Sequence, residues 1–185
     1  SVCRSLNWYM ENRELTEHDL FRLNEVWHSW MHHSRFSHVQ KEKALASMNG
    51  ARLQAHTFLK NADWLIITLG SSFSYRLTGD ASRASEALHA GVANCHRAPA
   101  SWFSKEMLDI QAMQEMLTAT IQQLRQFNPS LNIIFTVSPV RHIRDGVVEN
   151  NRSKARLIEV IHQLTTSHSF IHYFPAYELV IDVLR

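Results

Sequence analysis

Cysteine is scarce in this chain, which has two cysteines among its 185 residues. Cys3 and Cys95 lie far apart and lack the spacing of metal ligands, so the fold does not depend on a disulfide framework. This usage is typical of a reducing compartment, and the sequence shows no secretory leader. We therefore expect a cytoplasmic protein.

Long apolar runs and clusters of one charge are also missing. No stretch approaches the roughly 20 apolar residues that a membrane span needs. The formal net charge is +2, and basic and acidic residues are interspersed. Nucleic-acid surfaces carry basic runs with interleaved aromatic residues, and this sequence has no such run. We expect neither a membrane nor a nucleic acid among the partners.

The five glycines include no glycine-rich phosphate loop, which argues against a nucleotide binder, and we expect no cofactor. The length suits one domain, whose folding would bury roughly 70% of the unfolded surface. Internal repeats and low-complexity linkers are absent, so we predict a single α/β domain over residues 1–185. The sequence begins without methionine and stops in mid-pattern at Leu184-Arg185, which fits either trimming or a natural short protein whose methionine is removed.

The first 60 residues have helical patterns. Thr16 and Asp19 have the spacing of a capping box, and apolar residues then recur at three and four positions from Leu20 to Met31. Ser37 and Gln40 offer a second helix start, for a long helix that ends at about Lys60.

Three short apolar runs then alternate with helical patterns. Residues 63–69, 131–137 and 170–174 read as strands, the first of them buried on both faces. Helices are expected over residues 104–127, from Asn150 through Ala155, Ile158, Ile161 and Leu164, and from Pro175, with a surface excursion and a short helix over 78–91. This alternation predicts crossover units and a parallel sheet with helices on both faces.

Ligands of open parallel sheets bind beyond the carboxyl ends of the strands. Gly70, Ser71 and Ser72 follow the first strand, where backbone amides and hydroxyls are able to stabilise an oxyanion. Ser138, Arg141 and His142 follow the second strand, where Arg141 and His142 either face a ligand or anchor their loop against Asp145 or Glu149. A Gly-Ser turn alone is usually only a turn, but two such segments on neighbouring strands indicate a site.

Two further patterns have a functional and a structural interpretation. Asn150, with Ser153 and Lys154, opens a helix whose N-terminus suits an anion, but a capped helix start needs no ligand. His28 and His32 have a spacing that binds zinc on a helix. A third ligand is lacking, so we favour core histidines beside tryptophans and predict no metal site.

Six motifs carry a resemblance to a known family. The most specific are VANCH and SPVRH, and the resemblance spans nearly the whole chain. The motifs are HHSRFS (32–37), ITLGSSFSYR (67–76), VANCHRAP (92–99), FTVSPVRHIRDG (135–146), ENNRSKA (149–155) and YFPAYELVID (173–182). Together they resemble the GSCFA domain family, which is grouped with the SGNH hydrolase-like fold.

The resemblance implies a three-layer α/β/α sandwich with a mostly parallel, flavodoxin-like sheet. It also implies a serine hydrolase, whose nucleophile needs a histidine base and fixed oxyanion donors. The family's N-terminal Gly-Ser-Cys-Phe-Ala motif and C-terminal Asp-x-x-His-Pro segment are both absent from this sequence, so the resemblance implies a domain that is incomplete at both ends. The segment that begins at Gly70 matches the family's second motif. Ser72 stands where that motif has an asparagine that donates to the oxyanion, and Asn94 is the residue that would take over this donor role. Ser71 as nucleophile is the less favoured alternative.

We therefore predict an SGNH-like esterase or acyltransferase that acts on an acylated small molecule or glycan. This chain would supply the oxyanion side, with Gly70, Ser71, Ser72 and Asn94. Its substrate walls would comprise His96, Ser138, Arg141, His142 and Asn150. The alternatives are a non-catalytic binding or scaffolding domain and a phosphate binder that uses the Asn150 helix start. The oligomeric state stays open.

Overall fold

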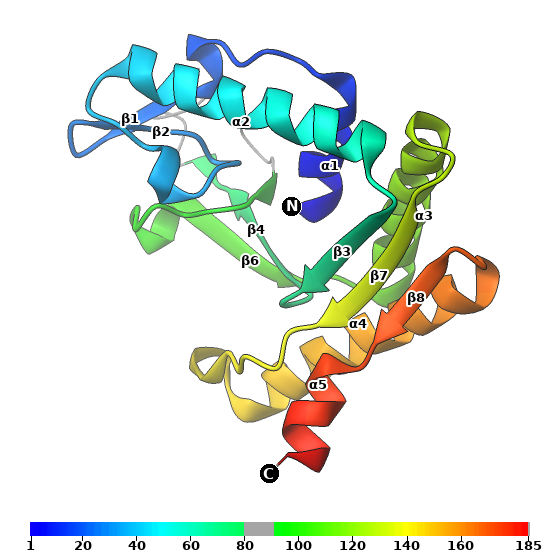
Figure 1. Cartoon of the computed structure of the whole chain (residues 1–185). Helices are drawn as coiled ribbons and strands as arrows, with labels where there is room; N and C mark the ends of the chain where they lie inside the picture. The colour runs from blue at the N-terminus through cyan, green and yellow to red at the C-terminus, as the bar shows by residue number, and fades with distance from the viewer. Residues whose placement is uncertain (80–90, 185) are drawn as a thin grey trace. The chain divides into compact units, whose positions relative to one another are not determined.

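The computed structural model describes residues 1–79 and 91–184 (Figure 1). It divides the chain into two compact units. Unit 1 comprises Ser1–Lys60 and Ser74–Glu106, and unit 2 comprises Asn61–Phe73 and Met107–Arg185. The expectation of one domain over residues 1–185 stays a prediction.

Unit 2 is built on a parallel sheet of three strands in the order β3-β7-β8. These are β3 (Trp64–Leu69), β7 (Asn132–Val137) and β8 (Ile171–Phe174). Trp64 pairs with Asn132 and Leu69 with Val137, so β3 and β7 begin and end together. All three predicted strands and their parallel pairing are confirmed, and the chain is an α/β protein.

Two long helices pack with this sheet. They are α3 (Ile110–Phe127) and α4 (Val147–Ser167), and Figure 1 shows α4 behind β7 and β8. The helix predicted over 104–127 is confirmed from Ile110 onward, and its side chains Met113, Leu117 and Ile121 are buried. The last helical segment consists of α5 (Ala176–Glu178) and a π-helical turn, η6 (Leu179–Val183).

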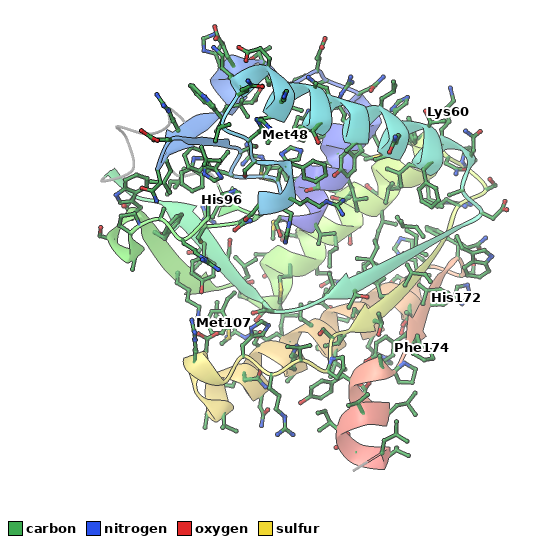
Figure 2. The ribbon with its side chains drawn as sticks, turned by 60° about the vertical axis from the view of Figure 1, so that its left-hand side comes forward. Met48, Lys60, His96, Met107, His172 and Phe174 are labelled. Carbon is green, nitrogen blue, oxygen red and sulfur yellow. The ribbon has the colours of Figure 1, made fainter. Side chains whose placement is uncertain are left out.

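The two faces of this sheet differ in burial. On β3, Ile67 and Leu69 are buried, whereas Ile66 is 67% exposed. On the same face as Ile66 lie His172 and Phe174 of β8, both exposed (Figure 2). The prediction that the first strand is buried on both faces is therefore wrong, because side chains alternate along an edge strand and only one set is buried.

Unit 1 contains two long helices, a hairpin and a second small sheet. The hairpin joins β1 to β2, and the sheet has the order β5-β4-β6 with β4 antiparallel to β5. The elements are α1 (Val2–Glu11), η1 (Glu17–Asp19), β1 (Phe21–Leu23), β2 (Val26–His28), η2 (Ser34–Phe36), α2 (Lys41–Asn61), β4 (Phe73–Leu77), β5 (Gly91–Val92), η4 (Ala100–Trp102) and β6 (Phe103–Met107). The predicted long helix to about Lys60 is confirmed as α2.

The helix predicted from Leu20 to Met31 is wrong, because this segment forms the β1–β2 hairpin. Leu23 pairs with Val26, which leaves Asn24 and Glu25 as a two-residue turn. Both turn residues have positive φ angles, 48° and 64°, as a type I′ turn requires. The three- and four-residue spacing of the apolar residues was coincidental. The Thr16–Asp19 capping box does form, but it starts only the short turn η1.

Smaller corrections concern α3, α4 and one segment outside the described residues. Residues 104–107 belong to strand β6 instead of the predicted helix. The predicted helix is confirmed as α4, where Ile161 and Leu164 are buried, while Ala155 is exposed. The short helix predicted over 78–91 lies outside the described residues.

Candidate functional site

The ends of β3 and β7 meet at one edge of the unit 2 sheet, as predicted. Beyond the last register pair, the amide of Ser138 donates to the carbonyl of Leu69 at 2.9 Å. The segments 70–73 and 138–142 therefore leave the sheet side by side. Gly70 is exposed, and a Cβ built on it would meet no described atom within 4 Å. There is thus open space for a ligand beside its backbone.

Ser153 of α4 fixes the loop after β3. Its hydroxyl oxygen accepts the amide of Ser72 at 2.8 Å and lies 3.0 Å from the hydroxyl of Ser72. The hydroxyl of Ser71 lies 3.3 Å from the same oxygen and accepts the amide of Phe73 at 3.1 Å. Ser72 and Ser153 are buried, whereas Ser71 is half-buried. Ser72 therefore anchors this loop, and its amide is already engaged.

Lys154 joins the two strand ends. Its side chain is 1% exposed, and its ammonium donates to the carbonyls of Gly70 at 2.5 Å and Ser138 at 2.7 Å. The ring of Tyr177 lies 5.9 Å from the same nitrogen. Burial lowers the pKa of Lys154, because it disfavours the charged form. One side chain thus holds both loops of the candidate site.

Asn150 anchors the loop after β7. Its side-chain oxygen accepts the amide of His142 at 2.9 Å, and the Ser138 hydroxyl accepts the amide of Val140 at 3.2 Å. Asn150 is buried in the first turn of α4, whose N-cap is Gly146, so the prediction that Asn150 caps this helix is wrong. The fixed loop supports exposed side chains at Arg141 and His142.

The alternative anchor for Arg141 and His142 was Asp145 or Glu149. Glu149 instead forms an ion pair with Arg152 at 2.8 Å. The amide of Asp145 donates to the carbonyl of His142 at 3.1 Å, which is a backbone contact within η5 (Ile143–Asp145). The side chains of Arg141 and His142 are exposed.

Asn94 and His96 belong to unit 1, where they line a pocket of about 480 Å³. Asn94 joins the two segments of its wall. Its amide nitrogen donates to the Ser34 hydroxyl at 3.2 Å, and its oxygen accepts the amide of His96 at 3.0 Å. The lining residues are His32, His33, Ser34, Ala93, Asn94, His96 and Arg97.

His96 has one engaged and one unpaired ring nitrogen. Nε2 donates to the carbonyl of Ser29 at 2.8 Å, so it carries the proton of the neutral ring. Nδ1 is buried and has no hydrogen-bond partner among residues 1–79 and 91–184. Burial lowers the pKa of His96, which keeps the ring neutral near pH 7. Nδ1 is therefore a free acceptor in a buried position.

The zinc interpretation of His28 and His32 assumed that both residues lie on one helix, and this assumption is wrong. His28 lies on β2, and the helix that would place it above His32 does not form. His32 is a buried core residue that packs edge-on against Trp8 at 5.1 Å, and burial lowers its pKa to about 4. In the part of the chain that the structure describes, no group of three or more His, Cys, Asp or Glu side chains is placed to hold a metal ion.

Ser153 and Lys154 were predicted only as part of a helix start. The signal for their role was a break in the apolar stripe of α4. Asn150, Ser153 and Lys154 lie on the face that Leu157 and Ile161 continue, and all five are buried. Polar residues on a buried helix face need partners, which are found here in the loops after β3 and β7.

The serine-containing loops thus lie at the carboxyl ends of parallel strands, where ligands of open α/β sheets bind. The GSCFA family matches residues 1–185, so this chain belongs to the GSCFA family. Membership suggests an SGNH-like hydrolase-type domain. No curated protein and no solved structure matches the chain. Within the described ranges, every helix is too short or too polar to cross a membrane.

Proposed function

We propose that this chain is the core of an SGNH-like serine esterase or acyltransferase that acts on an acylated small molecule or glycan. The observation that carries the proposal is the pair of strand-end loops held by Ser153 and Lys154. Catalysis of acyl transfer depends on donors that are fixed before the charge develops. Loops fixed by buried side chains meet that requirement.

The proposal divides the strand-end residues by their contacts. Gly70 and Ser71 are accessible and would face the acyl group, with backbone amides toward the oxyanion. Ser72 and Asn150 are buried and would act as positioning residues. Ser138, Arg141 and His142 would form the substrate wall.

The resemblance assigns the nucleophile and its base to the GSCFA and Asp-x-x-His-Pro motifs, which this sequence lacks. We infer that hydrolysis needs those segments. Ser71 remains the alternative nucleophile within this chain, because its hydroxyl is only half-buried.

We also propose the finer fold, a three-layer α/β/α sandwich with a flavodoxin-like sheet. The support is the exposed face of the parallel sheet, which carries Trp64, Ile66 and Phe174. Apolar side chains on both faces of a parallel sheet are typical of sheets covered by helices on both sides.

A second candidate is a binding or scaffolding domain without catalysis. The engaged amide of Ser72 favours it, since this amide donates to Ser153 and is not available to an oxyanion. A ligand that raises the melting temperature without turnover would support this candidate.

The two candidates are separated by labelling with a fluorophosphonate serine probe, read by intact mass. The probe is applied to this chain and to one extended by its native flanking sequence at both ends. We expect labelling of the extended chain only, lost when its upstream serine is replaced by alanine. Labelling of this chain at Ser71 would move the nucleophile there. Absence of labelling in both would overturn the hydrolase proposal in favour of the binding domain.

A further inference from the structure

The loop after β3 has two consecutive backbone amides without a partner. Gly70 and Ser71 lie between the end of β3 and Ser72, whose amide donates to the hydroxyl of Ser153 at 2.8 Å. In the part of the chain that the structure describes, no group accepts the amide of Gly70 or that of Ser71. Gly70 is exposed and Ser71 is half-buried. Since backbone N–H groups are strong donors, this pair is available to a ligand.

The direction of the Gly70 amide follows from the pairing of β3. The carbonyl of Leu69 accepts the amide of Ser138 at 2.9 Å, so this carbonyl points toward β7. A trans peptide bond places its N–H opposite its C=O. The N–H of Gly70 belongs to the same peptide group as the Leu69 carbonyl and therefore points away from β7. In the described sheet this is the unpaired edge, because β3 has β7 as its one neighbour (Figure 1).

Lys154 fixes the direction of the Ser71 amide. Its ammonium binds the carbonyls of Gly70 and Ser138, at 2.5 and 2.7 Å, so both carbonyls point to one position between the two loops. The N–H of Ser71 shares a peptide group with the Gly70 carbonyl, and it therefore points away from the ammonium and from the loop after β7. Consecutive amides of a regular strand alternate in direction, whereas these two point to the same side.

The loop after β7 lacks a matching pair next to the strand end. Residue 139 is proline, so the Ser138 carbonyl that Lys154 binds shares its peptide group with no N–H. The next amide, that of Val140, donates to the hydroxyl of Ser138 at 3.2 Å. The donors nearest to the two strand ends are therefore both on the loop after β3.

Two N–H groups that point to one side suit a single oxygen with negative charge. Acyl transfer develops such a charge on the carbonyl oxygen of the substrate, and donors fixed in advance stabilise it. Here the peptide groups are fixed from behind, by Ser138 and by the buried ammonium of Lys154. The ammonium also polarises the Gly70 carbonyl, which strengthens the Ser71 N–H as a donor.

We propose that the amides of Gly70 and Ser71 form a two-donor oxyanion site on the side of β3 that faces away from β7. The inference rests on the proposed hydrolase function and deepens it by naming the donors and their direction. It also accounts for the missing asparagine at Ser72, since neither donor is a side chain.

The reaction at this site is balanced. The nucleophile's oxygen bonds to the acyl carbon, its proton passes to the base, and the electron pair of the C=O π bond moves to the oxygen that the two amides bind. When the C=O bond forms again, the bond to the leaving group breaks. The leaving group then takes the proton from the base.

Exchanging one amide N–H for an ester oxygen tests the proposal without changing any side chain. The extended chain is made with glycolate in place of Gly70, or with the α-hydroxy analogue of serine in place of Ser71. We expect kcat for p-nitrophenyl acetate to fall about 10²–10³-fold in each, since each loses one donor, while KM stays within about twofold. Glycolate in place of Gly50, in the middle of α2, is the control and should leave kcat unchanged.

Hydrogen exchange tests the geometry in the present chain, without catalysis. The amides of Gly70 and Ser71 should exchange at least about 100-fold faster than the amide of Ser72. Protection of both amides would overturn the proposal.

The kinetic outcomes separate this inference from the hydrolase function. An active extended chain whose kcat is unchanged by both ester exchanges would overturn the two-donor site alone. A fall in kcat with an equal rise in KM would indicate a loosened loop and would also overturn it. An extended chain with neither turnover nor fluorophosphonate labelling would overturn both.

Discussion

The strand-end loops of unit 2 and the pocket of unit 1 differ in whether their buried polar groups have hydrogen-bond partners. In unit 2 the hydroxyl of Ser153 and the ammonium of Lys154 are used within the chain, each by two or more partners. In unit 1 a ring nitrogen of His96 is left unpaired. Saturated contacts stabilise a scaffold, whereas an unpaired buried polar group costs stability. The comparison therefore separates polar groups that hold the fold together from one that weakens it.

The largest effect on this comparison should come from Lys154→Met. The change leaves the carbonyls of Gly70 and Ser138 without the ammonium that binds them both, so we expect a loss of about 3 kcal/mol in the free energy of unfolding. Urea denaturation measures it, with Lys43→Met on the exposed face of α2 as the control. A Lys154→Met chain as stable as the parent would show that the ammonium is not needed to hold the loops.

Acid should weaken unit 1 through His32. Burial lowers the pKa of His32 from 6.5 to about 4, so the unfolded chain takes up a proton at a higher pH than the folded chain does. The contribution of the neutral His32 ring to the free energy of unfolding is complete above pH 6.5 and is lost as the pH falls toward 4. We expect a loss of about 2 kcal/mol between pH 7 and pH 5.

The measurement is a series of urea midpoints against pH for the parent chain and for His32→Gln. The variant should lose about 2 kcal/mol less over this range. His28 and His96 also have lowered pKa values, so a remaining slope in the variant is expected. Identical slopes in both chains would rule out His32 as the source.

Ser153→Ala should have an intermediate effect. It removes the acceptor of the buried Ser72 amide, which should destabilise the chain by about 1.5 kcal/mol. Ser47→Ala, at an exposed position of α2, is the matched control. Hydrogen exchange at the Ser72 amide should accelerate only in Ser153→Ala. Unchanged exchange there would argue against Ser153 as the anchor of this loop.

The smallest change in stability should come from Gly70→Ala. Since no described atom lies within 4 Å of the added Cβ, we expect less than about 0.5 kcal/mol. In the extended chain, however, the methyl group would occupy the space proposed for the substrate, and esterase activity should fall about tenfold or more. Gly50→Ala in the middle of α2 is the control, and it should stabilise the chain by about 1 kcal/mol without affecting activity.

The sequence predicted the parallel sheet of unit 2 because its strands are short apolar runs with clear ends, such as Asn132–Val137. The positions of Gly70 and Ser138 could also be predicted, because the end of each strand determines where the next loop begins. The β1–β2 hairpin was missed because Leu20, Leu23 and Trp27 have helical spacing by chance. In the structure, the two positive φ angles of its turn distinguish the hairpin from a helix.

The contacts of the candidate site were less predictable than its place. Ser153 lies 81 residues from Ser72, and no local pattern connects them. The unpaired nitrogen of His96 could not be predicted from the sequence either, because it depends on which groups surround the ring after folding. A polar break in the buried stripe of α4 was the one signal that the sequence offered.

The double contact of Lys154 also bears on how the protein opens. Its nitrogen binds carbonyls 84 and 16 residues away along the chain. Opening of either loop breaks one of the two bonds of the same ammonium. The fluctuations of the two loops are thereby coupled through Lys154. A ligand that binds one loop would therefore also reduce the fluctuations of the other.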